Sequence, residues 1–300
     1  MENNHQSEKT NFIPGMTPGQ RIIFIWGPVL LKWAISMGVS MIAGVMIAFG
    51  LVMHDPKNVM NMMNDQDALI EFAQRTLVKF TTPIEGAAAL ITIFVMLYLI
   101  HKDDKSEMAY GIVPNKKAPL MKYWMVIIIS GMTSMALNNL ILIGNLSRYS
   151  EAYEQVSEAL FSPGLAVQII CLCFLVPIAE ELVFRGIVYR RIRWESRAGV
   201  AIFYSAAIFA VLHGNLVQGI FGFLMGILFG YLREKFGSVL APVMAHIVAN
   251  LLTVLSSEYG LYQWEMSDIR LIGGVTVACA VVSTMVYLAV RGINERPEMI

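Results

Sequence analysis

An adjacent pair of acidic residues, Glu180 and Glu181, stands at the end of an apolar stretch and is followed by Arg185. Charged groups are costly within a membrane span, so such a pair needs either partners or a chemical task. In a helix, residues four apart share a face, and an acid that precedes its base is the better order. Glu181 is therefore expected to pair with Arg185, while Glu180, rotated by about 100°, can face a water-filled site. The structural alternative is that both acids join the nearby arginines at the membrane edge.

Two histidines fall in later apolar stretches. One ends the run from Phe209 to His213, and the other begins the run from His246 to Asn250. His246 and Asn250 share a helix face, so their hydrogen-bonding side chains project into the same space. Taken singly, each histidine is more often a contact between helices than a catalytic group. Three further polar residues indicate no particular reaction and are expected to pack or to line a cavity: Glu85, Asn138 and Asn139.

One carboxylate, two imidazoles and one carboxamide are together the parts needed to hydrolyse an amide inside a membrane. The carboxylate can take a proton from water while a neighbouring imidazole orients that water. A second imidazole and an amide N–H can stabilise the tetrahedral oxyanion. A serine or cysteine nucleophile lacks support, because Cys171 and Cys173 precede the acids by two turns or more and no serine stands in a comparable motif. The side chains of Glu180, His213 and His246 also form a His₂Glu set that would suit catalytic zinc.

The composition is typical of a membrane protein. Of the 300 residues, 56% are hydrophobic and 15% are charged, whereas a soluble domain carries roughly a quarter charged residues. The surplus apolar surface is expected to face lipid. A formal net charge of zero argues against nucleic acid as a partner, because no basic field is available to neutralise phosphates. The three cysteines lie in apolar segments, which favours packing over a disulfide or a thiolate metal cluster: Cys171, Cys173 and Cys279.

Stretches of about 17–25 apolar residues mark transmembrane helices, and the sequence predicts an all-α, polytopic fold with about eight of them. The expected spans lie near residues 25–53, 81–100, 123–144, 165–184, 198–213, 215–232, 239–257 and 270–290. They would form one transmembrane domain at 23–292, between a cytoplasmic tail at 1–22 and a short tail at 293–300. The polar start of the chain predicts no cleavable signal peptide, so the first span is expected to stay as an anchor. Residues 56–80 are expected to form an interfacial amphipathic helix.

Lysine and arginine residues predict the orientation, because loops rich in them stay in the cytoplasm. They gather at 101–122, 185–197, 233–235 and 291–296, whereas the alternate loops hold few. Both termini are therefore expected in the cytoplasm. The compact chain with short loops further suggests the plasma membrane of a bacterium.

A stripe of small residues in the sixth span places Gly222, Gly226 and Gly230 at four-residue spacing. Such a stripe lets two helices approach each other closely. Packing within the bundle is the preferred interpretation and homodimerisation is the alternative, so a monomer is favoured.

The three motifs resemble those of the CPBP family (CAAX proteases and bacteriocin-processing enzymes, also called Abi), whose signatures are EExxxR, FxxxH and HxxxN or HxxxD. They stand here at 180–185, 209–213 and 246–250, in the expected order, within a core of about 160–255. The resemblance implies an all-helical intramembrane endopeptidase whose active site lies in a cavity of the helix bundle, opening towards the cytoplasm.

The resemblance also implies a role for each motif residue. In this family the first glutamate and the histidine of FxxxH are thought to activate water, which implies Glu180 and His213 here. His246 and Asn250 would form the oxyanion site. The residues with a supporting role would be Glu181, Arg185 and Phe209.

Several alternatives stay open at this stage. Metal-free chemistry is favoured over zinc, because the HExxH helix of common zinc peptidases is absent and the resembled family is more often described as glutamate-dependent. The expected substrate is a membrane-associated protein or peptide, and the motifs do not say whether it is prenylated. One alternative is a non-catalytic membrane partner or bacteriocin self-immunity protein that keeps the protease fold. Another is a transporter with a proton path through Glu85, Glu180 and the histidines, against which the absence of an inverted repeat speaks.

Overall fold

The computed structural model describes residues 16–62, 66–111, 116–146 and 150–293, and every regular element in these ranges is helical. Seven helical segments of the described chain are long and apolar enough to cross a membrane. They are α1 (Pro18–His54), α3 (Gln66–Ala109), α4 (Trp124–Ile143), the continuous segment Leu165–Glu195, α10 (Leu216–Phe236), α11 (Leu240–Glu258) and α13 (Ile269–Arg291). The predicted span at 198–213 is α9 (Ala198–Val211), an apolar helix of only 14 residues. The prediction of an all-α polytopic membrane protein is confirmed, with seven spans of full length and one short helix.

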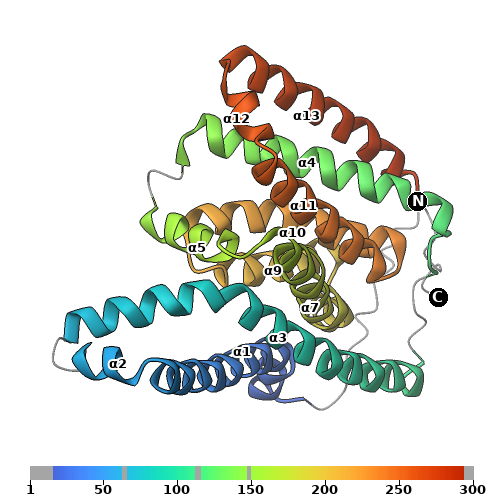
Figure 1. Cartoon of the computed structure of the whole chain (residues 1–300). Helices are drawn as coiled ribbons and strands as arrows, with labels where there is room; N and C mark the ends of the chain where they lie inside the picture. Colours follow the sequence, from blue (N-terminus) through green and yellow to red (C-terminus); the bar gives the residue numbers. More distant parts are fainter. Residues whose placement is uncertain (1–15, 63–65, 112–115, 147–149, 294–300) are drawn as a thin grey trace, which may run out of the picture.

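The spans lie in three groups (Figure 1). α1 and α3 pack together on one side of the molecule, and α4 packs against α13 on the other. The segment 165–195, α9, α10 and α11 lie between them. This middle group contributes buried aromatic residues to two apolar clusters, Phe184 to one and Phe229 to the other. It also carries all three sequence motifs, so the motifs lie where the bundle is packed on both sides.

The glycine stripe of α10 is used within the chain. A Cβ at Gly226 would lie 3.2 Å from the Cα of Ala206, and one at Gly230 would lie 3.4 Å from the Cα of Ile202. Both of these neighbours belong to α9. Since lipid tails are as apolar as leucine, close packing of this kind is what holds membrane helices together. The stripe therefore serves bundle packing, which was the preferred interpretation.

The segment Leu165–Glu195 is a single run of helix with two distorted stretches. It consists of α6 (Leu165–Gln168), η3 (Ile169–Leu175), α7 (Val176–Glu181), η4 (Leu182–Val188) and α8 (Tyr189–Glu195), of which η3 and η4 are π-helical. At the end of η3, the N–H of Val176 donates to the carbonyl of Cys171, five residues back. The next residue is Pro177, which has no N–H to offer to the carbonyl of Leu172. A π-helical turn inside a helix frequently marks a functional site.

The acid pair lies in the middle of this segment, so the prediction that it stands at the end of a span is wrong. The helix continues beyond the predicted limit of 184 because its arginines find partners. Arg185 is completely buried. In α8, Arg191 donates to both carboxylate oxygens of Asp103, at 2.8 and 2.9 Å. This ion pair attaches α8 to α3. It also provides a partner for one of the charges that, in the sequence, are typical of a loop.

The predicted interfacial helix at 56–80 is not a separate element. α2 (Pro56–Met62) is short, residues 63–65 lie outside the described ranges, and α3 continues without a break from Gln66 into its span. Figure 1 shows that α3 bends, and Pro83 lies inside it. Proline removes a backbone hydrogen bond and kinks a helix. The change in polarity near residue 80 therefore marks a kinked helix.

The sequence patterns did not predict α5 (Glu151–Phe161) or the short α12 (Leu261–Met266) and η1 (Leu120–Lys122). At the start of α5, the hydroxyl of Ser150 accepts a hydrogen bond from the N–H of Tyr153 at 3.2 Å, a typical helix N-cap. The predicted tails at 1–22 and 293–300 lie largely outside the described part of the chain, although α1 already begins at Pro18. The division into a core and two tails stays a prediction.

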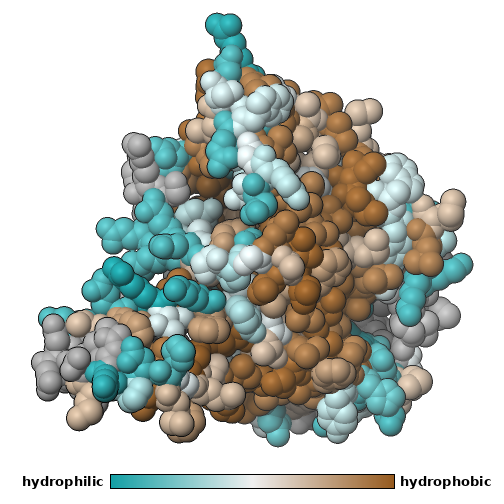
Figure 2. Space-filling view, in the orientation of Figure 1, coloured by the Kyte–Doolittle hydropathy of each residue, from teal (hydrophilic) through white to brown (hydrophobic). Residues whose placement is uncertain are grey.

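The surface has the polarity expected of a protein surrounded by lipid. Figure 2 shows a broad hydrophobic area over the middle of the visible face, with hydrophilic residues gathered towards its edges. α1 exposes Met41 and Phe49, and α13 exposes Val277 and Met285, each by more than half of its surface. Water-soluble monomers rarely expose apolar patches of such extent. The chain is therefore a multi-pass membrane protein.

Candidate active site

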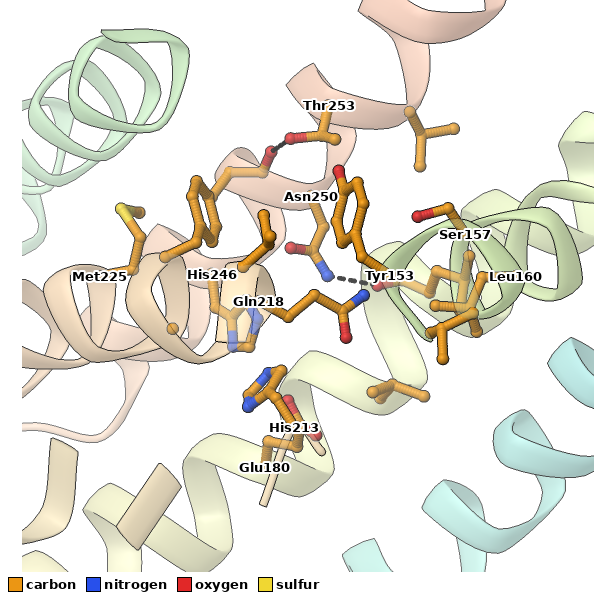
Figure 3. Close-up of a pocket in the computed structure, with 18 of the residues that line it drawn as sticks. Tyr153, Ser157, Leu160, Glu180, His213, Gln218, Met225, His246, Asn250 and Thr253 are labelled. Atoms are coloured by element: carbon orange, nitrogen blue, oxygen red, sulfur yellow. Dashed lines mark hydrogen bonds between the residues drawn. The ribbon is translucent and has the colours of Figure 1, made fainter. Parts of the chain in front are cut away.

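The four predicted catalytic side chains surround one cavity of about 480 Å³. Glu180 comes from α7, His213 from the turn after α9, and His246 and Asn250 come from α11. Figure 3 shows these side chains directed towards the same space. Residues from three separate motifs thus meet in the bundle, as the sequence predicts.

Two of the three additional polar residues also line the cavity. They are Glu85 of α3 and Asn138 of α4, whose amide nitrogen donates to the hydroxyl of Thr253 at 3.0 Å. The third, Asn139, is completely buried in α4 and does not line the cavity. Both outcomes, cavity lining and packing, were expected for this group.

Glu181 has an entirely different environment from Glu180. It is fully buried, and its Oε1 accepts a hydrogen bond from Arg185 Nη1 at 3.0 Å. Arg185 also donates through Nη2 to the carbonyl of Gly226 in α10, at 3.0 Å. The same Oε1 lies 2.9 Å from His246 Nδ1 in α11. The predicted pair between Glu181 and Arg185 therefore exists, and it ties three elements of the middle group together.

The partners of His246 decide which of its nitrogens carries hydrogen. Arg185 Nη1 already donates to Glu181 Oε1, so this oxygen is an acceptor and His246 Nδ1 donates to it. This leaves Nε2 as the nitrogen available to the cavity. In the neutral ring Nε2 is an acceptor, and it carries a hydrogen only when the ring is positively charged. Phe229 stacks on the ring with 4.9 Å between centroids, and the ring is held in place from two sides.

His213 is held through the same ring nitrogen, but by a carbonyl instead of a carboxylate. Its Nδ1 lies 2.8 Å from the carbonyl oxygen of Phe209, and because a carbonyl only accepts, Nδ1 must carry the hydrogen. In the neutral ring, Nε2 is then an acceptor. His213 lies just beyond α9, and Gly214 turns the chain there with a φ of 73°, which glycine adopts without strain. Both histidines thus leave Nε2 for the cavity, and they differ in the partner of Nδ1, a neutral carbonyl for His213 and a carboxylate for His246.

Asn250 is oriented by the π-helical stretch. Its Nδ2 donates to the carbonyl oxygen of Leu172 in η3 at 2.7 Å, drawn as a dashed line in Figure 3. This is the carbonyl that Pro177 cannot serve. A carboxamide has two N–H groups, so the second one remains for a group in the cavity. Pro177, three residues before the acid pair, is the sequence signal that could have predicted this contact.

Glu180 has a cationic partner that motif analysis missed. Lys32 Nζ of α1 lies 3.7 Å from Glu180 Oε1, and the two side chains are 25% and 15% exposed. Glu85 interacts electrostatically with both of them. Lys32 is the only Lys, Arg, Asp or Glu residue between Arg21 and Asp55. Because an ionisable residue inside a span suggests a function, this position could have been found from the sequence.

Phe209 lies between the buried ion pair and the cavity. Its ring meets His213 edge-on at 4.6 Å and His246 at 5.9 Å between centroids. On another side, the guanidinium carbon of Arg185 lies 4.8 Å from the ring centroid. Phe209 therefore contacts groups from all three motifs, and this position suits the supporting role that the resemblance implies.

The unpredicted helix α5 forms one wall of the cavity. Its contribution comprises Tyr153, Val156, Ser157, Ala159, Leu160 and Phe161. The helix is attached to α3, where Thr82 Oγ1 donates to the carbonyl of Leu160 at 2.8 Å. Four of its cavity residues follow the spacing i, i+3, i+4 and i+7, the pattern of one helix face. That pattern was the available signal for this wall.

The alternative zinc ligands Glu180, His213 and His246 all line the cavity. Within the described part of the chain, however, no three His, Cys, Asp or Glu side chains are arranged so that they could hold a metal ion. His246 also has one ring nitrogen engaged by Glu181. The geometry as it stands does not fit a His₂Glu zinc centre.

Comparison with known proteins adds two matches. The sequence model of the family described as "Type II CAAX prenyl endopeptidase Rce1-like" matches residues 162–252. A curated protein of Bacillus subtilis (strain 168), named "Putative membrane peptidase YdiL", is 26% identical over 113 residues, which are 38% of this chain and 44% of that protein. The alignment thus spans less than half of that relative. No solved structure matches the chain.

The fold and the cavity define a polytopic membrane protein with a polar site enclosed by its helices. The matched region coincides with the three motifs and with the expected core of about 160–255. This part of the chain is thus similar to a family of CAAX prenyl endopeptidases and to a membrane peptidase, in agreement with the resemblance that the motifs indicate.

Proposed function

We propose that this protein is an intramembrane endopeptidase that hydrolyses a peptide bond of a membrane-associated protein or peptide. The observation that carries the proposal is that a carboxylate, two imidazoles and a carboxamide line one cavity, and that the imidazoles are held through Nδ1 by different partners, a carbonyl and a carboxylate. His213 Nε2 is proposed to accept near the carboxylate of Glu180, whereas His246, whose Nδ1 is held by the carboxylate of Glu181, is proposed to donate through Nε2 as an imidazolium near the amide of Asn250. Hydrolysis of an amide needs both kinds of group, one for the water and one for the oxyanion.

In the proposed reaction, Glu180 takes a proton from a water molecule while His213 Nε2 accepts the second hydrogen of that water. The water oxygen forms a bond to the carbonyl carbon of the substrate. His246 Nε2–H and the free N–H of Asn250 stabilise the resulting oxyanion. When the C–N bond breaks, Glu180 returns its proton to the departing amine, so the carboxylate is restored.

Lys32 is proposed to keep Glu180 ready for this task. A carboxylate in an apolar site tends to become protonated, and a protonated acid cannot act as a base. The ammonium group at 3.7 Å favours the charged carboxylate. Lys32 is therefore a positioning residue that acts through Glu180.

Glutamate-dependent chemistry without zinc is proposed, because the cavity presents the carboxylate and the two imidazoles with separate partners. The direct test is to measure metal in the purified, active protein. We expect much less than one zinc per chain and no loss of turnover with a chelator. A content near one zinc per chain, lost together with activity in His246→Ala, would contradict the proposal.

The protein is proposed to lie in a bacterial plasma membrane with both termini in the cytoplasm and to act as a monomer. The orientation follows from the distribution of lysine and arginine. The monomer is supported by the use of Gly226 and Gly230 in packing against α9, which leaves this stripe unavailable to a second copy.

The proposed activity can be tested on membranes from a strain that lacks the gene. Purified protein is added in detergent, and new peptide termini are identified by mass spectrometry in water enriched in ¹⁸O. We expect defined cleavage products with the heavy oxygen in the new carboxyl terminus. The matched control is Glu180→Gln at equal amount and equal melting temperature, which should yield none of these products. Identical products from both proteins would refute the proposal and favour a non-catalytic membrane partner.

A further inference from the structure

The cavity has a closed end and an open end. Along α10, the lining residues Met225 and Phe229 are each 1% exposed, and Ala249 of α11 beside them is fully buried. At the other end, Val156 and Phe161 of α5 line the cavity and are each 36% exposed. The cavity therefore opens where α5 lies, near the last turn of α4 and the first turn of α10.

The open end of the cavity belongs to the water-exposed rim of the protein. α5 carries Glu151, Glu154 and Glu158 on its outer side, and all three are exposed. Carboxylates in such a row are not placed in hydrocarbon, so α5 lies at the membrane surface. In Figure 1, α2, α5 and α12 lie at the same end of the bundle, on the left. These are the short helices that follow α1, α4 and α11. This end of the bundle therefore holds the connections that follow those three spans.

The opposite end of the bundle holds most of the basic residues. Among the described residues, those in its helix ends and connections include Lys102, Lys105, Lys117, Lys122, Arg197, Arg233, Lys235 and Arg291. The backbone joins two of these regions, since the N–H of Ala118 donates to the carbonyl of Phe236 at 3.0 Å. Loops rich in lysine and arginine remain in the cytoplasm. The open end of the cavity is therefore on the other side of the membrane.

We infer that the cavity opens at the extracytoplasmic face, and that the protein takes peptides whose scissile bond reaches it from outside the cytoplasm. The inference rests on the proposed function and names the side and the class of its substrates, which are exported or extracytoplasmic segments of membrane-associated chains. It differs from the cytoplasmic opening that the family resemblance implies. Water for hydrolysis enters by the same route, because the closed end is sealed by Met225 and Phe229.

The side can be tested by labelling single added cysteines in intact cells with a membrane-impermeant maleimide. Ser157→Cys places a thiol on the cavity wall of α5, and Glu158→Cys places one on the exposed side of the same helix. Lys117→Cys is the matched control at the basic end. The native cysteines are all buried, so the unchanged protein gives the background. We expect both α5 variants to react in intact cells and Lys117→Cys to react only after permeabilisation.

The reverse pattern would overturn the inference, as would reaction of Ser157→Cys and Glu158→Cys only after permeabilisation. The labelling is repeated in the Glu180→Gln background, because accessibility does not depend on turnover. A protein that labels as expected but cleaves nothing refutes the proposed function and leaves the sidedness intact. A protein that cleaves its substrates but labels in reverse refutes the sidedness alone.

Discussion

Glu180 and Glu181 are neighbours in α7, yet they face two different regions of the molecule. Glu180 lines the cavity beside Lys32 and the histidines, whereas Glu181 is sealed between Arg185 and His246 in the packed interior. The first region is open to water and has room for a substrate. The second region is closed to water and has no room for a substrate, and Glu181 there holds Arg185 and His246 in place. Two identical side chains can thus lie in entirely different environments, because one helical step separates their directions.

The largest expected effect comes from removing the carboxylate on the cavity side. Glu180→Gln keeps the shape of the side chain but cannot accept a proton, so we expect turnover to fall by about 10⁴-fold, the upper range for a general base. The melting temperature should stay within a few degrees of wild type. Peptide cleavage and thermal unfolding in detergent measure the two quantities. Glu85→Gln, a carboxylate change in the same cavity, is the control and should retain most activity.

The corresponding change on the packed side should act mainly on stability. Glu181→Gln leaves Arg185 buried without a charged partner, which we expect to cost about 3–5 kcal/mol. Replacing both residues together, as Glu181→Gln with Arg185→Met, should recover part of that loss, because the unpaired charge is gone. Unfolding in detergent measures both variants. If Glu181→Gln were as stable as wild type, the assignment of the pair to architecture would be wrong.

The proposed oxyanion donor, Asn250, has the next largest expected effect. Asn250→Ala should reduce turnover by about 10²–10³-fold with little change in KM, since the interaction forms in the transition state. It also leaves the carbonyl of Leu172 without its donor, which should cost about 1–3 kcal/mol of stability. Steady-state kinetics on a cleaved peptide separate the two parameters. An increase in KM alone would indicate that Asn250 binds substrate instead.

The smallest expected effect sharpens the contrast between the two regions. Lys32→Met should lower kcat by about tenfold, the value of one ion pair of roughly 1 kcal/mol or slightly more, while Lys32→Arg should retain activity. Without the ammonium group, Glu180 is easier to protonate, so the acidic limb of the pH–rate profile should move to higher pH. The groups that bear on Glu180 from the elements around it are Lys32, Glu85, Arg185, His213 and His246. An unchanged pH profile in Lys32→Met would show that Lys32 only fills space.

The motifs allowed the residues of both regions to be predicted, because helical spacing alone tells which side chains share a face. The pairing of Glu181 with Arg185 follows from that spacing, whereas the convergence of His213 and His246, which belong to different elements, was expected from the family resemblance of the three motifs. The position of the acid pair in the middle of its helical segment could not be predicted from spacing. The ion pair of Arg191 with Asp103 lets the helix continue through a charged stretch. Such partners are distant in sequence and invisible to a hydropathy pattern.

Other parts of the site depend on single residues that carried a readable signal. Lys32 interrupts an otherwise uncharged span, and Pro177 withholds the N–H that Leu172 would need. The helix α5 has an amphipathic spacing, but with 11 residues it is too short to be recognised by a search for membrane spans. The tautomers of the histidines could not be predicted, because they depend on the carbonyl of Phe209 and the carboxylate of Glu181.

The most direct test of the account compares a strain lacking the gene after complementation with wild type or with Glu180→Gln at equal membrane levels. The membrane peptidome and the phenotype of the deletion are recorded together. The account predicts that Glu180→Gln leaves uncleaved species at the level of the deletion and does not rescue the phenotype. Full rescue by Glu180→Gln, with no cleavage product changed, would contradict the account and would show that the cavity has no catalytic role.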